Sequence, residues 1–365
     1  MKHSQQKSGL MFGFVLIISF VLVLPAARFA YFAMSPYNAE SQDTKIIEVH
    51  KGENPNEITK VLVGTGSISD GKHFILLGRL TRQWRRIKAG EYQVSAAMTP
   101  IEIFGVLTSG ISVSHPVTVR EGENMYEITE DLAAKGLVVR SQFLALCRNA
   151  GFIRSVGFFK DHLPPTLEGY FFPDTYFFNR SMSYSDIALE MIKHFFANWS
   201  QNEEKRSHEW NLTQHQIITL ASIIEKETGA PEERAVISSV FHNRLRKRMR
   251  LQSDPTTIYG MWERYKGKIH KSDLSVKNEY NTYVIEALPV GPIGNPGKEA
   301  IQAALYPSES QFLYFVSHND GTHQFSRTFE EHNRAVKRFQ LDPNARAGKS
   351  WRDHLKKPAS VQTGQ

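Results

Sequence analysis

Cysteine is almost absent from this chain of 365 residues, which contains only Cys147. A single cysteine excludes an internal disulfide framework and any zinc site that is built from several cysteines. Leu144 and Leu146 lie beside it in the sequence, and this apolar setting predicts that Cys147 is buried.

Long hydrophobic runs are also scarce. Only residues 8–27 form an uncharged run dense in Leu, Ile, Val and Phe, and Lys2 and Lys7 precede it. Twenty helical residues span about 30 Å, the thickness of a bilayer's hydrocarbon core. We therefore predict a transmembrane anchor over residues 8–30; a cleavable signal peptide is the alternative, although no clean Ala-x-Ala site follows the run. The positive-inside rule then places residues 1–7 in the cytoplasm and the body of a single-pass protein outside.

Neither sign of charge dominates, since 44 Lys and Arg face 37 Asp and Glu, a net charge of +7. This modest excess is compatible with nucleic acid, a membrane surface or an acidic polymer as a neighbour. We interpret the basic run at residues 244–250 as a solvated helix end that faces an anionic polymer. Because a body outside the cell meets no DNA, we expect no nucleic acid partner. A hydrophobic fraction of 41% excludes wholesale disorder, and the length predicts two or three folded units.

An internal repeat follows the anchor. Residues 49–59 return as residues 119–129, with seven of eleven positions identical. Each copy reads as a short strand, a Gly-containing turn and a helix of about ten residues that ends at a glycine. The pattern resembles LysM-type modules, which hold polymers containing N-acetylglucosamine, and predicts a duplicated LysM-like module over residues 46–150. It leaves open whether this module binds glycan or only spaces and packs.

Residues 164–178 combine many aromatic side chains with the carboxylates of Glu168 and Asp174. Aromatic faces can stack on sugar rings while carboxylates accept hydrogen bonds from sugar hydroxyls, so the segment suits a glycan site. The alternative is a pair of strands with a packed aromatic core.

A helix is predicted over residues 214–229, with Thr213 as its N-cap. Its apolar residues follow the spacing of one buried face, and Glu225 and Glu227 fall on the two flanks of that stripe. A carboxylate at the edge of an apolar face can be partly desolvated, with a raised pKa that suits a general acid. The periodicity does not choose between the two glutamates, and an ordinary solvated flank is the alternative for either.

A second helix begins near Pro231, and three polar loops follow it. Their Asp-Pro, Gly-Pro and Asn-Pro-Gly sequences are turn chemistry, and functional side chains concentrate on loops. We predict that they form a cleft wall in a mixed α+β catalytic domain over residues 160–340, followed by a basic mobile tail over residues 341–365. Their candidate side chains are Gln252, Asp254, Tyr259, Asn281 and Tyr283.

Seven motifs occur in an order that resembles the YceG-like family. They are LEGYFFPDTY (167–176), ASIIEKET (221–228), QSDPT (252–256), YNTY (280–283), NPG (295–297), LYFV (313–316) and EHN (331–333). The resemblance implies a single-pass protein of the bacterial inner membrane, with a LysM-like part and a catalytic domain on the outside. It also implies an endolytic lytic transglycosylase that cuts nascent peptidoglycan, sets strand length and works beside peptidoglycan synthases (penicillin-binding proteins).

The resemblance assigns the catalytic role to Glu225. A lytic transglycosylase cuts the β-1,4 bond between N-acetylmuramic acid and N-acetylglucosamine with the muramic acid's own C6 hydroxyl as nucleophile. One glutamate protonates the glycosidic oxygen and, as a carboxylate, then takes the C6 hydroxyl proton, which leaves a 1,6-anhydro end. No metal or cofactor is expected. The side chains expected to hold the sugar are Glu168, Tyr170, Asp174, Glu227, Gln252, Asp254, Tyr259, Asn281 and Tyr283.

Two other functions remain open. The first is a non-catalytic envelope protein that binds glycan through its repeat and scaffolds cell-wall synthases. The second is a hydrolytic muramidase that uses water and a second carboxylate, such as Glu168 or Asp254, because glycoside hydrolases generally need two.

Overall fold

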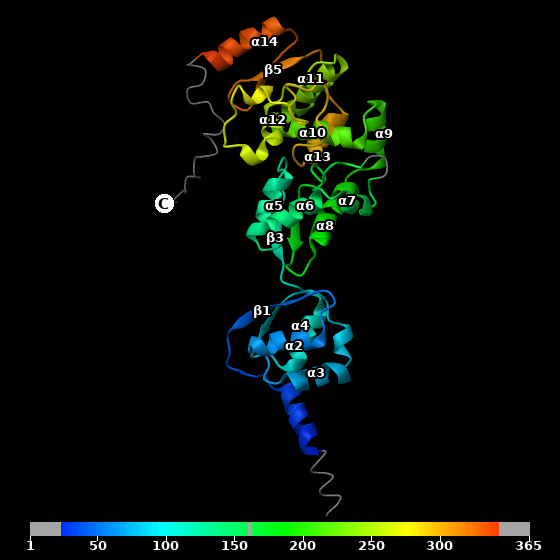
Figure 1. The fold of residues 1–365 in the computed structure, drawn as a ribbon, viewed down its shortest axis with the longest axis vertical. Coiled ribbons are helices and arrows are strands. Elements are labelled where there is room, and N and C mark those ends of the chain that lie inside the picture. The colour runs from blue at the N-terminus through cyan, green and yellow to red at the C-terminus, as the bar shows by residue number, and fades with distance from the viewer. Residues whose placement is uncertain (1–22, 160–162, 343–365) are drawn as a thin grey trace, which may run out of the picture. The chain divides into compact units, whose positions relative to one another are not determined.

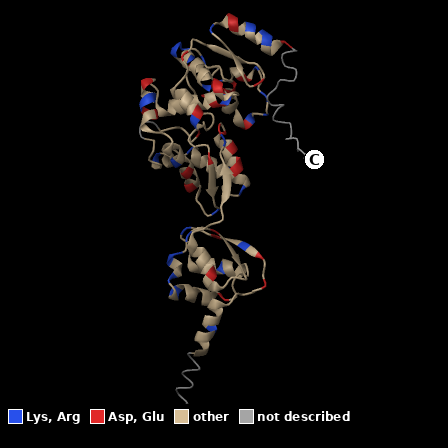
Figure 2. Ribbon diagram, turned by 180° about the vertical axis from the view of Figure 1, so that it is seen from behind, with Lys and Arg blue, Asp and Glu red and all other residues tan. Residues whose placement is uncertain are grey.

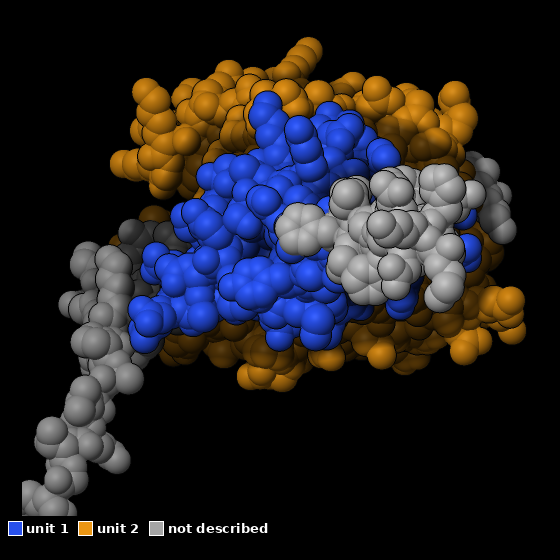
Figure 3. Space-filling view, turned by 90° about the horizontal axis from the view of Figure 1, so that it is seen from below, with its two compact units in different colours: residues 1–116, 177–183 blue, residues 117–176, 184–365 orange. Residues whose placement is uncertain are grey.

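The computed structural model describes residues 23–159 and 163–342. The chain divides into two compact units, one of residues 1–116 with 177–183 and the other of residues 117–176 with 184–365. Figure 3 colours the two units separately. The predicted cytoplasmic segment, most of the predicted anchor and nearly all of the predicted basic tail lie outside the described residues.

The first unit is built on an antiparallel pair of strands, whose register runs from Thr44 opposite Ser95 to Val49 opposite Gly90. Ile47 and Val49 point from this pair into a core where Phe74 stacks on Phe104 with ring centroids 4.2 Å apart. Residues 23–34 are helical. The other elements are β1 (Thr44–Val49), α2 (Pro55–Gly64), α3 (Gly71–Leu80), the 3-10 turn η1 (Gln83–Arg85), β2 (Gly90–Ser95) and α4 (Pro100–Ser109).

Of the predicted membrane anchor over residues 8–30, only residues 23–30 fall within the described chain. Within residues 23–159 and 163–342, no helix combines the length and the apolar character needed to cross a bilayer.

The repeated sequence produces the same local structure twice. Asn54 caps α2 and Asn124 caps α5 (Met125–Ala134), each in a capping box with the glutamate three residues on. Gly52 and Gly122 precede these caps with φ of +82° and +77°, a backbone conformation that a side chain disfavours. Identical turn and cap residues therefore specify identical helix starts.

The two copies nevertheless belong to different units, which differs from the predicted single module over residues 46–150. The reason is the partner that each helix finds. Ile58 and Leu62 of α2 join the core of the first unit, whereas Tyr126 of α5 packs against the core of the second. That either copy binds glycan as a LysM module does stays a prediction.

The second unit is organised around α10 (Gln214–Glu227), in which every residue from Ile217 to Ile224 is buried. A helix that is apolar on all sides must be enclosed by other elements. Figure 1 shows α11 (Arg234–Arg246), α12 (Asp254–Gly260) and α13 (Lys298–Leu305) gathered around α10, and their buried residues share one core with it. The remaining helices are α6 (Arg140–Cys147), α7 (Ala150–Ser155), α8 (Tyr184–Ala197), α9 (Gln201–Glu209) and α14 (Phe329–Val336), with 3-10 turns η2 (Pro231–Glu233), η3 (Trp262–Arg264) and η4 (Asp273–Ser275) and the π-helical η5 (Lys337–Leu341).

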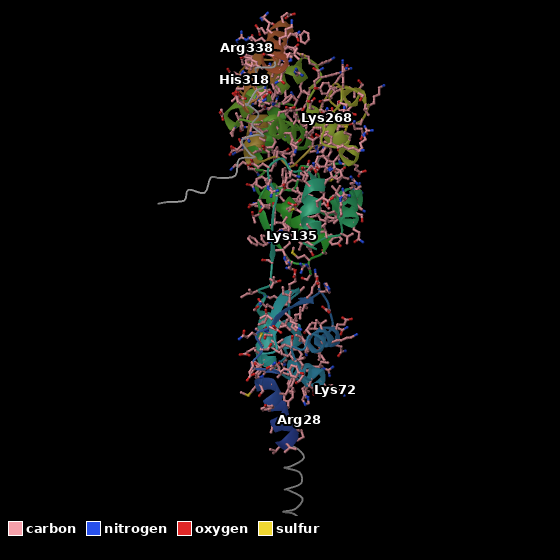
Figure 4. All side chains as sticks on the ribbon, turned by 90° about the vertical axis from the view of Figure 1, so that its left-hand side faces the viewer. Arg28, Lys72, Lys135, Lys268, His318 and Arg338 are labelled. Atoms are coloured by element: carbon pink, nitrogen blue, oxygen red, sulfur yellow. The ribbon has the colours of Figure 1, made fainter. Side chains whose placement is uncertain are left out.

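The strands of the described chain form three two-stranded sheets. Besides β1–β2, these are β3 (His115–Thr118) with β4 (Thr175–Phe178), and β5 (Tyr314–Ser317) with β6 (His323–Ser326). In Figure 4, His318 of the β5–β6 turn and Arg338 of η5 lie close together, and the His318 ring is 4.4 Å from that of Phe339. The mixed α+β class predicted from the sequence is confirmed, as are the burial of Cys147 and the N-cap of α10 at Thr213.

The basic run at residues 244–250, which begins in the last turn of α11, departs from the prediction. Charges of both signs are interspersed along the ribbon (Figure 2), but Arg244 is buried rather than solvated. Its guanidinium donates to the carbonyls of Leu313 and Leu251 and lies 5.2 Å from the Tyr314 ring centroid. The prediction of a wholly solvated run is therefore wrong at Arg244, where the fold uses the cation to tie loops to α11.

Candidate active site

The candidate site lies at the C-terminal end of α10. Thr213 caps the helix at its start, and the helix ends after Glu227 because Thr228 has extended backbone angles. Glu225 and Glu227 occupy the last turn, on either side of the exposed Lys226. The sequence periodicity placed the glutamates correctly on the flanks of the apolar stripe.

Glu225 is held by one backbone amide and one cation. The Gly297 N–H donates to its Oε2 at 3.0 Å, and Nη2 of Arg234 lies 3.4 Å from its Oε1. Only 8% of the Glu225 side chain is exposed. Burial raises its pKa and the negative charge of Glu121 adds to this, while the Gly297 amide and Arg234 lower it; the net result is a raised pKa.

Two glycines make room around Glu225. A side chain at Gly297 would collide with the carboxylate of Glu121, and a Cβ on Gly122 would lie 3.4 Å from Cγ of Glu225. Neither glycine was predicted to matter, although both stand in sequence motifs: Gly297 in NPG, and Gly122 in the second copy of the repeat.

The loop at residues 295–297 is fixed by backbone pairing with the second repeat copy. The Gly122 N–H donates to the Asn295 carbonyl at 2.8 Å, and the Asn295 N–H donates to the Glu123 carbonyl at 2.8 Å. The buried Asn295 side chain donates to the same Glu123 carbonyl and accepts from the Phe171 N–H. This network presents the Gly297 amide to Glu225.

Glu168 is fully buried and joins three segments of the same unit. Its carboxylate accepts from the Met125 N–H at the start of α5, from the Tyr259 hydroxyl at 2.8 Å and from Nδ2 of Asn295 at 3.1 Å. Burial raises its pKa to about 7, although the Met125 amide and the Tyr259 hydroxyl oppose the shift. No part of Glu168 is exposed, so the structure gives no support to its predicted contact with substrate.

Glu227 faces a different set of side chains from Glu225. The Ser253 hydroxyl donates to its Oε1 at 2.5 Å. Burial raises the pKa of Glu227 to about 7. The negative charge of Asp254 adds to this shift, whereas the hydrogen bond from Ser253 and the positive charge of Arg244 oppose it. Two contacts bring the other predicted residues here: the Tyr283 hydroxyl donates to Asp254 at 2.7 Å, and Nη1 of Arg244 lies 3.4 Å from Oε1 of Gln252.

Three further residues that were predicted to contact the sugar are buried in the structure. Tyr170 is 1% exposed and hydrogen-bonds to His215, while Tyr259 donates to Glu168. Asn281 is fully buried, accepts from the Thr257 hydroxyl and donates to the carbonyl of Val276. The structure thus follows the packed-core alternative for Tyr170.

Asp174 is exposed and lies 3.4 Å from Nε2 of His194. None of the contacts in the described residues joins it to Glu225 or Glu227. A cavity of about 500 Å³ opens beside Tyr170 among Phe158, Phe196 and Trp199, but neither glutamate lines it. Among residues 23–159 and 163–342, no group of three or more His, Cys, Asp or Glu is arranged to hold a metal ion.

The fold and the site define an α+β protein whose candidate active site is centred on carboxyl groups. The model of the YceG-like family matches residues 47–338, and the chain belongs to that family. The resemblance seen in the sequence motifs is confirmed.

Named relatives agree with this assignment. The endolytic murein transglycosylase of Bacillus subtilis is 30% identical over 325 residues, which cover 85% of this chain and 89% of the relative. The protein of that name in Streptococcus pneumoniae is 26% identical over 336 residues, or 83% of this chain and 60% of the relative. The crystal structure of a yceG-like protein from Listeria monocytogenes superposes with a TM-score of 0.56 at 31% identity, covering 80% of this chain and 99% of that one.

The buried Glu168 generates a prediction about stability and pH. Its pKa is raised from 4.5 to about 7 in the folded state, so the folded state binds its proton more tightly than the unfolded state does. Proton binding by Glu168 therefore contributes at most about 3 kcal/mol to the free energy of unfolding. This contribution is fully present below about pH 4.5 and is lost as the pH rises through 7. In Glu168→Gln, unfolding free energy should fall less between pH 5 and pH 8 than in the unmutated protein.

The same variant should also be less stable at pH 5 by about 1–3 kcal/mol, because an amide cannot accept from all three donors. Denaturant unfolding at both pH values measures the two effects. An unchanged pH slope in Glu168→Gln would show that Glu168 is not held protonated by the fold.

Proposed function

We propose that this protein is an endolytic murein transglycosylase that cleaves peptidoglycan strands, with Glu225 as its catalytic residue. The observation that carries the assignment of Glu225 is its place in the last turn of α10. It is largely buried, with a raised pKa, and is still 8% exposed. Membership of the YceG-like family and the names of the relatives support the reaction class.

The chemistry requires one group that first gives and then takes a proton. Protonated Glu225 donates to the glycosidic oxygen between N-acetylmuramic acid and N-acetylglucosamine as the C1–O bond breaks. The resulting carboxylate takes the proton of the muramic acid C6 hydroxyl while that oxygen bonds to C1. The products are a 1,6-anhydro-N-acetylmuramic acid end and a free hydroxyl on the leaving sugar, and no water is consumed.

The surroundings of Glu225 suit both protonation states. Burial and the charge of Glu121 favour the protonated acid before the bond breaks. Once the proton has left, the Gly297 N–H and Arg234 are in place to stabilise the carboxylate. The four exposed or half-buried residues on the Glu227 side, namely Glu227, Gln252, Asp254 and Tyr283, are proposed to bind the sugar hydroxyls.

The hydrolytic alternative needs a second carboxylate on the other face of the sugar. Glu168 does not suit this role, because it is enclosed by three donors. Asp254 is exposed, so the distinction between transglycosylase and muramidase is made by the end group of the product.

Glu225→Gln keeps the size of the side chain and removes its titratable proton. We expect the turnover of purified peptidoglycan to fall by about 10⁴ or more, since one group serves both proton transfers, while thermal unfolding is little changed. Glu227→Gln is the matched variant on the other flank of α10 and should retain far more activity. Mass spectrometry of the products of the unmutated protein should find 1,6-anhydro ends.

Full activity in Glu225→Gln would contradict the catalytic assignment, and a dead Glu227→Gln beside an active Glu225→Gln would transfer it to the other glutamate. New reducing ends would keep the site and make the reaction hydrolysis. Absence of any cleavage by the unmutated protein would favour the glycan-binding scaffold.

We further propose that residues 8–30 anchor the protein in the bacterial inner membrane, with residues 1–7 in the cytoplasm and the enzyme outside. The uncharged run behind Lys2 and Lys7 supports this. Control of strand length and contact with peptidoglycan synthases stay predictions of the family resemblance.

The anchor has a direct test in cells that express the full chain. We expect the protein to stay in the membrane pellet after carbonate washing, to begin at its original N-terminus, and to be digested by protease added to spheroplasts. A mature protein that begins near Arg28 would show that the run is a cleaved signal peptide.

A further inference from the structure

The second copy of the repeat contributes a side chain to the candidate active site. Residues 49–59 and 119–129 agree at seven of eleven positions, but Lys51 of the first copy is replaced by Glu121 in the second. Position 121 is therefore not fixed by the needs of the repeated turn. Its carboxylate stands beside the group that the proposed function makes catalytic.

The geometry around Glu121 follows from the backbone pairing of its neighbour. Gly122 donates to the Asn295 carbonyl, and this pairing brings the Glu121 carboxylate against Gly297. The amide of that same glycine donates to Glu225 at 3.0 Å. Glu121 and Glu225 thus approach one glycine from two segments of the same compact unit.

Glu121 is not explained as a structural ion pair. It is exposed, and within residues 23–159 and 163–342 its carboxylate forms no hydrogen bond or ion pair. By contrast, the carboxylate of Glu123 in the same turn accepts hydrogen bonds from both the guanidinium and the backbone N–H of Arg120. An exposed carboxylate without a partner, beside another that is largely buried, costs Coulomb energy that a lysine would not.

The charges that face Glu225 come from four elements. Nη2 of Arg234 on α11 lies 3.4 Å from Oε1 of Glu225, and Nη1 of the same guanidinium lies 3.7 Å from Oε2 of Glu299 on α13. The stem of Lys226, on α10 itself, passes beside Gly122. Glu121, on the repeat turn, is the anion that opposes Arg234 at Glu225.

We propose that Glu121 is a functional part of the active site and acts through Glu225. Its negative charge opposes the effect of the positive charge of Arg234 on the Glu225 carboxyl. The proposal rests on the proposed function, since it concerns how Glu225 works as an acid. Arg234 favours the carboxylate, whereas the charge of Glu121 adds to burial in favouring the protonated form. Arg234 can therefore stabilise the Glu225 carboxylate after proton transfer, while Glu225 still binds its proton before the reaction begins.

The test is the pH dependence of kcat/KM for cleavage of purified glycan strands by the full chain. Activity requires protonated Glu225, so its alkaline limb reports the pKa of that group in the free enzyme. In Glu121→Gln this limb should move to lower pH by about 0.5–1 unit, and in Glu121→Lys further in the same direction. Arg234→Gln removes the opposing charge and should move the limb to higher pH.

Lys51→Gln is the matched control, because it changes the same position of the first repeat copy, in the other unit. It should leave the pH profile unchanged. Glu121→Lys places in the second turn the residue that the first turn already carries, so folding should be preserved, and circular dichroism checks this.

The outcomes separate the two proposals. If the unmutated protein cleaves glycan and both Glu121 variants have the same alkaline limb of kcat/KM as it does, the role of Glu121 is overturned and the proposed function is left intact. A uniform loss of rate without a shift of the limb would also overturn it, since that indicates a structural role. An unmutated protein that cleaves glycan at no pH would overturn the proposed function and this inference with it.

Discussion

The candidate site depends on a short piece of backbone pairing between Gly122, Glu123 and Asn295. These amides and carbonyls join two segments that are more than 170 residues apart in the chain, and they bring the loop of Gly297 and the turn of Glu121 together beside Glu225. The pairing holds the loop from which the Gly297 amide, two residues beyond Asn295, donates to Glu225. The glycine of the repeat turn makes the pairing with a positive φ, and so a motif that recurs as a structural unit contributes to the candidate site.

Three buried or partly buried glutamates of one unit differ in their exposure, their hydrogen-bond donors and their neighbouring charges, and these surroundings determine what each carboxyl can do. Glu168 has raised pKa but no exposed surface, and its donors make it a joint between α5, α12 and the loop of Asn295. Glu227 meets a hydroxyl and the Asp254 carboxylate, on a side of α10 that carries several polar groups. Glu225 combines burial with a backbone amide, a cation and an anion, which allows it to exist in both states. Catalysis needs that last combination.

Sequence reasoning was most successful where local rules decide the structure. The N-cap of α10, its apolar stripe, the flanking positions of its two glutamates and the turns of the repeat all follow from spacing within a few residues. It failed where long-range packing decides. Tyr170 and Asn281 have the residue types of a glycan site, yet both are buried, because aromatic and amide groups serve a core and a cleft equally well. Glu121 and Arg234 went unnoticed because nothing local reveals that they converge on Glu225.

The proposed chemistry requires that the fold holds Glu225 as an acid. The most direct measurement is a pH titration of the folded protein by carbon NMR with labelled glutamate carboxyls, in which the Glu225 signal is identified by its loss in Glu225→Gln. We expect a midpoint above the ordinary glutamate value of 4.5. A midpoint at or below 4.5 would mean that the Gly297 amide and Arg234 outweigh burial and Glu121, and that the fold does not hold Glu225 as an acid.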